Sequence, residues 1–467
     1  MAFVSVSFLF LFLPAVLAAY FIVPAKYTAV RNFVLLGCSL LFYVCGEQLM
    51  IFVLLISAVG NYLFALSFER YPRMKKALLV ASVIFNVGLL SYFKYTEFFF
   101  ENLNLIGGID IKIPEIVVPM GMSFFTFCGM SYVFDVYRKA CAPQKNILNI
   151  ASYITMFPYI LSGPIVRYGD IGGALISRKI TLDGFAYGVR RFIAGFGKKM
   201  LLANTMNIVA ADIFSKDPSG LSAPLAWIGA VAYSFQIFFD FSGYSDMAIG
   251  TGYMLGFKFP ENFNYPYIAR SITEFWTRWH MSLSSWFRDY VYIPLGGNRR
   301  GLPRQILNIL IVWLLTGIWH GAAWNFIFWG LYFAAVLIME KMFLGKLLKK
   351  TWRPLSHIYA LFFIIIGWVI FNGSGASFIA RYIGAMFGAG SIAEGLSGHA
   401  VYLITQYKAE FALCLICSVP LIRLVPEKIR TGTVWRVAAN LVLLAVFALS
   451  VIAVVNSTFS AFIYFRF

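Results

Sequence analysis

Long apolar stretches, separated by short polar loops, recur along the whole sequence. They lie near residues 3–23, 31–46, 49–68, 77–98, 119–136, 147–165, 187–212, 221–240, 305–319, 322–343, 356–371, 401–422 and 434–463. An α-helix needs about 20 apolar residues to cross a bilayer, where it satisfies its own backbone hydrogen bonds. The pattern therefore predicts an all-α polytopic membrane protein with about 11 to 13 helices, some of them re-entrant or interfacial.

The composition supports this class. Hydrophobic residues make up 60% of the 467 positions, charged residues make up 12%, and the mean hydropathy is +0.78. A water-soluble domain does not carry so apolar a composition. Val16-Leu-Ala18 resembles a signal-peptide cleavage site, but no Lys or Arg precedes Lys26, so we expect an uncleaved first helix.

The net charge is +18, and the basic residues are concentrated in short loops between apolar stretches. Clusters occur at 70–76, 138–145, 299–304 and 346–353. This positive-inside pattern predicts that these loops face the cytoplasm and that the amino terminus is extracytoplasmic. Nucleic-acid binding would need a soluble basic face, which this sequence lacks.

Six cysteines are present, most of them in or beside apolar stretches, so we expect no structural disulfide. Cysteines, histidines and carboxylates show no clustered spacing typical of a metal site. We therefore expect no metal and no permanently bound cofactor.

The stretch from Gln305 to Trp324 carries an ionisable ring, His320, within Thr316-Gly-Ile-Trp-His-Gly-Ala-Ala-Trp. An ionisable group at bilayer depth is costly unless it faces a protein interior or a wet cavity, which makes it a candidate functional site. Thr316 lies one helical turn earlier on the same face, and Trp319 is adjacent. Flanking glycines would let another helix or a substrate approach closely. A hydrogen bond from His320 to a neighbouring helix fits this stretch equally well.

A second polar cluster, Asp240-Phe-Ser-Gly-Tyr-Ser-Asp246, follows the apolar stretch 221–239. We expect the helix to break at Gly243, and this density of carboxylates and hydroxyls is too polar to face lipid. The full set of candidates for lining a cavity or binding substrate is Gln236, Asp240, Ser242, Tyr244, Asp246, Thr316 and Trp319.

The least hydrophobic part of the chain, 258–304, predicts short interfacial helices. Ser271-Ile-Thr-Glu274 is a capping box, and Glu274 can pair with Arg278 one turn later. The segment either anchors the protein at the lipid headgroups or folds over a cavity and brings His280 towards His320.

The turn Gly296-Gly-Asn-Arg-Arg-Gly301 combines backbone amides with two cations, Arg299 and Arg300. These arginines are candidates for binding the phosphates of a cytoplasmic donor molecule. Positive-inside anchoring explains the same arginines.

Several ordered motifs resemble those of the membrane-bound O-acyltransferase superfamily, in particular its bacterial alginate O-acetyltransferase branch. They are Asp240 to Asp246, Glu261-Asn-Phe-Asn-Tyr-Pro-Tyr267, Ser271-Ile-Thr-Glu-Phe-Trp-Thr-Arg-Trp-His280, Arg288-Asp-Tyr-Val-Tyr-Ile-Pro-Leu-Gly-Gly297 and Gly317-Ile-Trp-His-Gly-Ala322. The resemblance extends to 119–138, 162–167 and 462–467, and so covers nearly the whole chain. Cys128, Tyr159 and Arg466 depart from the residues common in relatives.

The resemblance implies one membrane domain over residues 1–467, with a catalytic core at 236–324 and helices around a funnel-like catalytic cavity. It implies catalysis at His320, with His280 as the family's second histidine. An acetyl group from cytoplasmic acetyl-CoA would pass outward through the bacterial cytoplasmic (inner) membrane. A separate extracytoplasmic esterase-like (SGNH-type) transferase would complete the O-acetylation of an exported polysaccharide. Relatives acetylate alginate, peptidoglycan or other glycans, and a more distant branch transfers D-alanine to teichoic acid.

Histidine suits acyl transfer because its ordinary pKa of about 6.5 leaves it largely neutral near pH 7. His320 would take a proton from the acceptor hydroxyl as it attacks the thioester, with His280, nearby hydroxyls or amides stabilising the oxyanion. A covalent acetyl-histidine is the alternative. Two other functions remain open: a transporter or flippase that uses Asp240, Asp246 and His320 as a proton relay, and a non-catalytic scaffold of a polysaccharide machine.

Overall fold

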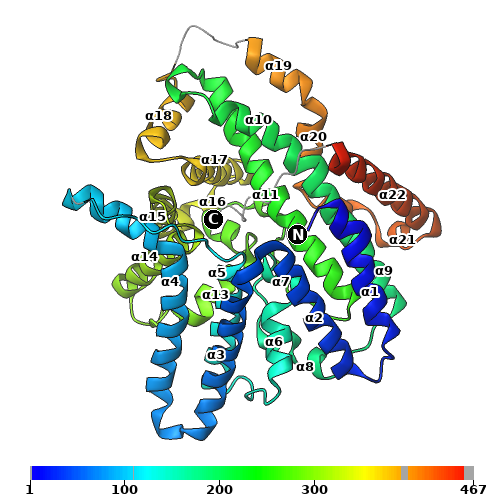
Figure 1. The fold of residues 1–467 in the computed structure, drawn as a ribbon. Helices are drawn as coiled ribbons and strands as arrows, with labels where there is room; N and C mark the ends of the chain where they lie inside the picture. The colour runs from blue at the N-terminus through cyan, green and yellow to red at the C-terminus, as the bar shows by residue number, and fades with distance from the viewer. Residues whose placement is uncertain (1–2, 109, 391–397, 457–467) are drawn as a thin grey trace. The chain divides into compact units, whose positions relative to one another are not determined.

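The computed structural model of the chain describes residues 3–108, 110–390 and 398–456. Within these ranges all regular secondary structure is helical (Figure 1). Seven helical stretches of the described residues are long and apolar enough to cross a membrane, or eight if the bent pair Gly398–Gln406 and Lys408–Cys417 is one span. The predicted all-α polytopic membrane architecture is therefore confirmed. The carboxy-terminal motif at 462–467, including Arg466, lies outside the described residues.

The chain divides into two compact units, and the first contains the residues up to Ile193 and the segment Tyr244–Glu261. Its elements are η1 (Phe8–Phe12), α1 (Leu13–Ile22), α2 (Thr28–Glu47), η2 (Gln48–Met50), α3 (Ile51–Arg70), η3 (Pro72–Met74), α4 (Lys75–Gly107), α5 (Met122–Tyr137), α6 (Ile147–Thr155), α7 (Phe157–Ile160), α8 (Tyr168–Ile176) and most of α9 (Leu182–Gly197).

A buried amide pair joins α3 to α4, which lie side by side in Figure 1. The Asn61 and Asn86 side chains donate to each other, with nitrogen to oxygen distances of 3.0 and 2.9 Å. Gly129 of α5 packs against this pair, because a Cβ there would come within 2.4 Å of the Asn61 amide nitrogen. Reciprocal pairing lets two polar side chains occupy an apolar helix interface without unsatisfied groups.

The second unit contains Ala194–Gly243 and Asn262–Ala453. Its elements are η4 (Lys198–Ala203), α10 (Asn204–Phe214), η5 (Pro218–Gly220), the first part of α11 (Ala223–Met254), η6 (Pro266–Ile268), α12 (Ile272–Trp276), α13 (Met281–Phe287), η7 (Arg288–Tyr292), α14 (Leu302–His320), α15 (Trp324–Met339), η8 (Glu340–Leu344), α16 (Gly345–Lys350), α17 (Arg353–Asn372), α18 (Ala376–Met386), α19 (Gly398–Gln406), α20 (Lys408–Cys417), η9 (Leu421–Leu424), α21 (Glu427–Arg430) and most of α22 (Thr433–Asn456). Helices α12, α13 and η7 are short, as predicted for 258–304, and their location at the membrane interface stays a prediction.

Helices α14 and α15 form a tight hairpin at glycine contacts. A Cβ on Gly317 would come within 2.4 Å of the carbonyl oxygen of Phe326, and one on Gly330 would come within 2.5 Å of that of Trp313. Only glycine permits so close an approach of the two helices. Gly317, which lies three residues before His320, therefore serves helix packing. Because the helices are antiparallel, η8 and α16 lie at the same end of the hairpin as the start of α14.

The expected helix break at Gly243 is wrong. Helix α11 continues from Ala223 to Met254 through the whole polar cluster. A Cβ on Gly243 would come within 2.8 Å of the carbonyl oxygen of Gly195. This glycine therefore allows a close helix contact and does not end the helix, because glycine weakens a helix by only about 1 kcal/mol relative to alanine.

Candidate active site

A cavity of about 250 Å³ in the second unit, hereafter the histidine cavity, brings His280 and His320 together. Its wall is formed mainly by α12, α13, η7 and α14, and it also contains Thr316, one of the candidates named from the sequence. Most of the remaining lining is apolar or aromatic. Arg288 lines the cavity with a side chain that is 63% exposed, so the cavity reaches the surface there. The two histidines lie 40 positions apart in the sequence and share one space only in the folded chain.

His320 is the last residue of α14, which ends because Gly321 adopts an extended conformation. The His320 ring is only 3% exposed. The rings of Trp329 and Phe371 meet it edge to face, with centroid distances of 4.9 and 5.2 Å. Trp319 lies between the histidines, with its ring centroid 5.0 Å from His320 and 5.9 Å from His280. Aromatic packing therefore fixes the imidazole plane and limits the access of water.

His280 caps the start of α13 in a left-handed conformation, with φ 43° and ψ 53°. This conformation is uncommon for a residue other than glycine and is maintained here by surrounding contacts. The main chain of Asn262 accepts from Met281 N at 2.9 Å, and Asn264 N donates to Arg278 O at 2.9 Å. These bonds fix residues 262–264 against the main chain on both sides of His280.

The side chain of Asn262 determines which tautomer His280 adopts. Its Oδ1 accepts from Ser282 N at 3.3 Å and Ser282 Oγ at 2.8 Å, and it lies 3.1 Å from His280 Nδ1. An acceptor oxygen at this position requires a proton on Nδ1, which leaves the lone pair on Nε2. Burial lowers the pKa of His280 from 6.5 to about 3, so the ring is neutral at ordinary pH.

Sequence reasoning did not assign a role to Asn262 or to Trp276. Asn262 lies in the Glu261 to Tyr267 motif, which contributes to the family resemblance but does not by itself indicate a chemical role for any of its residues. Trp276 lines the histidine cavity, and its buried indole nitrogen has no hydrogen-bond acceptor among the described residues. Its ring packs against Trp313 at a centroid distance of 4.6 Å. The indole N–H is thus a buried donor that no acceptor of the described residues satisfies.

Helix α12, which carries Trp276, is held at its amino end by three side chains. Ser271 Oγ accepts from Glu274 N at 3.0 Å, as the capping box predicts, while Glu274 accepts from the main chain of Arg270 at 2.9 Å. Glu340 accepts from the main-chain nitrogens of Ile272 and Thr273 at 2.6 and 2.8 Å. The predicted pair of Glu274 with Arg278 is present at 2.9 Å.

The polar residues of α11 are not among those that line the histidine cavity. In the second unit, Asp240 forms a buried ion pair with Lys199 at 2.5 Å, and Gln236 donates to Asn207 at 2.7 Å. Ser242 is buried. A buried carboxylate is stable only when it is paired, and Lys199 provides the opposite charge.

Tyr244 and Asp246 belong to the first unit. Asp246 pairs with Arg191 at 2.8 Å, and the same guanidinium binds Glu261. Tyr244 is fully buried, with its ring 5.0 Å from that of Phe3. These contacts hold the first unit together.

Arg299 and Arg300 are exposed and do not line the histidine cavity. Their turn precedes α14, whose other end carries His320. Among the described residues, no group of three His, Cys, Asp or Glu side chains is arranged to hold a metal ion.

Comparison with known proteins gives a consistent result. The model of the membrane-bound O-acyltransferase family (MBOAT) matches residues 40–380. The chain is 35% identical to the probable alginate O-acetylase AlgI of Pseudomonas putida over the full length of both chains. It is 40% identical to that of Azotobacter vinelandii, over 84% of this chain and 79% of the relative. It is 33% identical to the peptidoglycan O-acetyltransferase of Helicobacter pylori, over 86% and 82%. The chain therefore belongs to the membrane-bound O-acyltransferase family, in its alginate O-acetylase-like branch, and is an O-acyltransferase.

Proposed function

We propose that this protein moves an acetyl group from cytoplasmic acetyl-CoA across the membrane for the O-acetylation of an exported polysaccharide. The observation that carries the proposal is the convergence of His280 and His320 on one cavity. The names of the relatives support the acceptor class, because they denote proteins that acetylate alginate and peptidoglycan. The positive-inside charge pattern supports a cytoplasmic donor side in the inner membrane.

In this proposal His320 is the general base. It takes the proton of the acceptor hydroxyl while the hydroxyl oxygen attacks the thioester carbonyl. The tetrahedral oxyanion then expels the coenzyme thiolate, which takes the proton from His320. The rings of Trp329 and Phe371 limit water at the imidazole, which favours transfer over hydrolysis.

His280 and Trp276 have complementary roles. With its Nδ1 proton directed to Asn262, His280 presents Nε2 as an acceptor and cannot donate from this atom to an oxyanion. It is suited to orient the acceptor hydroxyl. Trp276 lines the same cavity and carries an N–H that no described residue satisfies, and we assign oxyanion stabilisation to this donor.

The family resemblance supports a second step outside the membrane. There, a separate extracytoplasmic esterase-like (SGNH-type) transferase receives the acetyl group and completes its transfer to the polysaccharide. The catalytic contribution of this chain ends with the acetyl ester of the acceptor hydroxyl on the outer side.

Purified protein in lipid nanodiscs, supplied with radiolabelled acetyl-CoA and a small soluble alcohol as a surrogate acceptor, tests this function without the extracytoplasmic transferase. We expect acceptor labelling and release of free coenzyme thiol, both lost in His320→Ala. His399→Ala is a matched control, because His399 binds Asp212 at 2.8 Å and does not line the histidine cavity. Equal thiol release by wild type and His320→Ala would contradict the proposal.

A further inference from the structure

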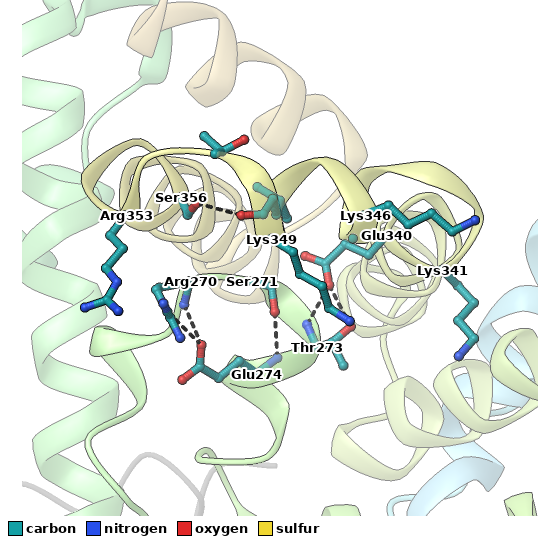
Figure 2. Close-up of a pocket in the computed structure, with 13 residues that line it drawn as sticks. Arg270, Ser271, Thr273, Glu274, Glu340, Lys341, Lys346, Lys349, Arg353 and Ser356 are labelled. Carbon is teal, nitrogen blue, oxygen red and sulfur yellow. Dashed lines mark hydrogen bonds and ion pairs between the residues drawn. The ribbon is translucent and has the colours of Figure 1, made fainter.

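A second cavity of the second unit, of about 680 Å³, is lined by cationic side chains (Figure 2). The cations of this basic cavity are Arg270, Lys341, Lys346, Lys349 and Arg353. They come from the segment before α12 and from η8, α16 and α17. Its volume is within the range of about 300 to 1,000 Å³ that is typical of sites for small ligands.

The two carboxylates in the wall are already engaged. Glu340 accepts hydrogen bonds from the start of α12 and from Tyr359 Oη at 3.2 Å. Glu274 pairs with Arg278 and accepts from the main chain of Arg270. Neither carboxylate forms an ion pair with a lysine of the basic cavity, and the five cations of the wall outnumber its two carboxylates.

Four of the cations in the wall have no carboxylate partner among the described residues. Lys341, Lys346, Lys349 and Arg353 form no ion pair with any carboxylate in the described ranges. Figure 2 shows Lys349 and Arg353 extending from α16 and α17 towards the segment from Arg270 to Glu274. A cavity lined by an excess of cations attracts an anion. Lys and Arg side chains, together with nearby hydroxyls, can donate hydrogen bonds to phosphate oxygens. Positive-inside anchoring explains the sign of these charges, but it does not require that they surround a hollow.

The basic cavity and the histidine cavity share Thr273 in their walls. Thr273 is the second residue of α12, and the same helix carries Trp276, which lines the histidine cavity. A ligand with phosphates at one end and a reactive group at the other would therefore place both ends against α12.

We propose that the basic cavity binds the phosphate groups of the acyl donor while its thioester occupies the histidine cavity. This assignment rests on the proposed function, because it takes the donor to be a phosphorylated coenzyme thioester. It places the donor's phosphates at Lys349 and Arg353, whereas Arg299 and Arg300 line neither cavity.

The test is the affinity of coenzyme A for the full chain in phosphatidylcholine nanodiscs, measured by calorimetry. Lys349→Glu and Arg353→Glu should each weaken binding at least tenfold, which is about 1.4 kcal/mol. Lys350→Glu is the matched control, because Lys350 makes the same charge change on the same helix but does not line the cavity. Its affinity should stay within twofold of wild type. Pantetheine, which lacks phosphates, should bind all four proteins alike.

Equal affinities of Lys349→Glu and Lys350→Glu for coenzyme A would overturn the assignment. The assignment would also be overturned if Lys349→Glu lost binding to phosphatidylglycerol vesicles but kept its affinity for coenzyme A. The cavity would then bind the phosphate of a lipid headgroup. His320→Ala should keep wild-type affinity and lose transfer, which separates the two proposals. If wild type binds coenzyme A through Lys349 but transfers no acetyl group, the phosphate site stands and the proposed function fails.

Discussion

The side-chain oxygen of Asn262 lies 3.1 Å from Nδ1 of His280 and also accepts from the main chain and hydroxyl of Ser282. One asparagine thus selects the tautomer of a buried histidine and supports its left-handed backbone. Because Nδ1 of His280 is bound to Asn262, this ring presents Nε2, and not Nδ1, to the histidine cavity.

Asn262→Ala removes three hydrogen bonds and should reduce kcat by at least tenfold, because His280 loses its fixed tautomer. Loss of a buried acceptor typically costs about 1 to 3 kcal/mol, so the melting temperature should also fall. Steady-state kinetics and thermal unfolding measure the two effects. Asn264→Ala is the control, because its side chain does not contact His280. Activity in Asn262→Ala equal to that in Asn264→Ala would remove the positioning role.

In His320→Ala the rate of acetyl transfer should fall by a factor of about 10² to 10⁴, which is the usual contribution of a general base. This is roughly 3 to 5 kcal/mol at about 1.4 kcal/mol per tenfold change in rate. The variant should still purify and bind coenzyme A, as binding and melting measurements would show. Retention of more than about a tenth of the wild-type turnover would exclude His320 as the base.

Trp276→Phe keeps an aromatic ring in the histidine cavity but removes the N–H donor. We expect kcat to fall by about 10²-fold, the lower end for loss of an oxyanion donor, with little change in donor KM. Trp227→Phe is the control, because its indole N–H donates to Met386 O at 3.0 Å in another part of the second unit. A Trp276→Phe enzyme with the kcat of the control would show that the oxyanion is stabilised elsewhere.

The neutral state of His280 predicts a pH dependence of stability. The unfolded chain binds a proton on this ring below about pH 6.5, while the folded protein resists protonation down to about 3. The contribution of neutral His280 is therefore present above 6.5 and is lost progressively as the pH falls from 6.5 towards 3. Melting temperatures from about pH 4 to about pH 8 should fall more steeply in acid for wild type than for His280→Gln. Parallel curves would show that His280 is not buried as a neutral ring.

The positive-inside pattern predicts the orientation of α4, which runs from Lys75 to Gly107. In a protein whose exposed Cys45 and Cys417 are replaced by serine, Leu105→Cys should react with an impermeant thiol reagent in intact cells. Arg73→Cys, beyond the other end of the helix, should react only after the cells are opened. The reverse result would place the amino terminus in the cytoplasm.

The amino-acid sequence by itself determined the class of fold, because the length of an apolar stretch and the hydrogen bonds of a helix are local properties. It also predicted the capping of α12 by Ser271, the pairing of Glu274 with Arg278 and the presence of His320 at the end of an apolar helix. These features depend on residues within one or two helical turns of each other.

Only the tertiary structure decided which polar residues meet. It paired Asp240 with Lys199 and Asp246 with Arg191, kept α11 continuous through Gly243, and joined Asn262 to His280. Local pattern could not predict these relationships, because a buried charge or amide is satisfied by whichever partner the packing of distant segments provides. The shared cavity of the two histidines arises in the same way, from the packing of α12 and α13 against α14.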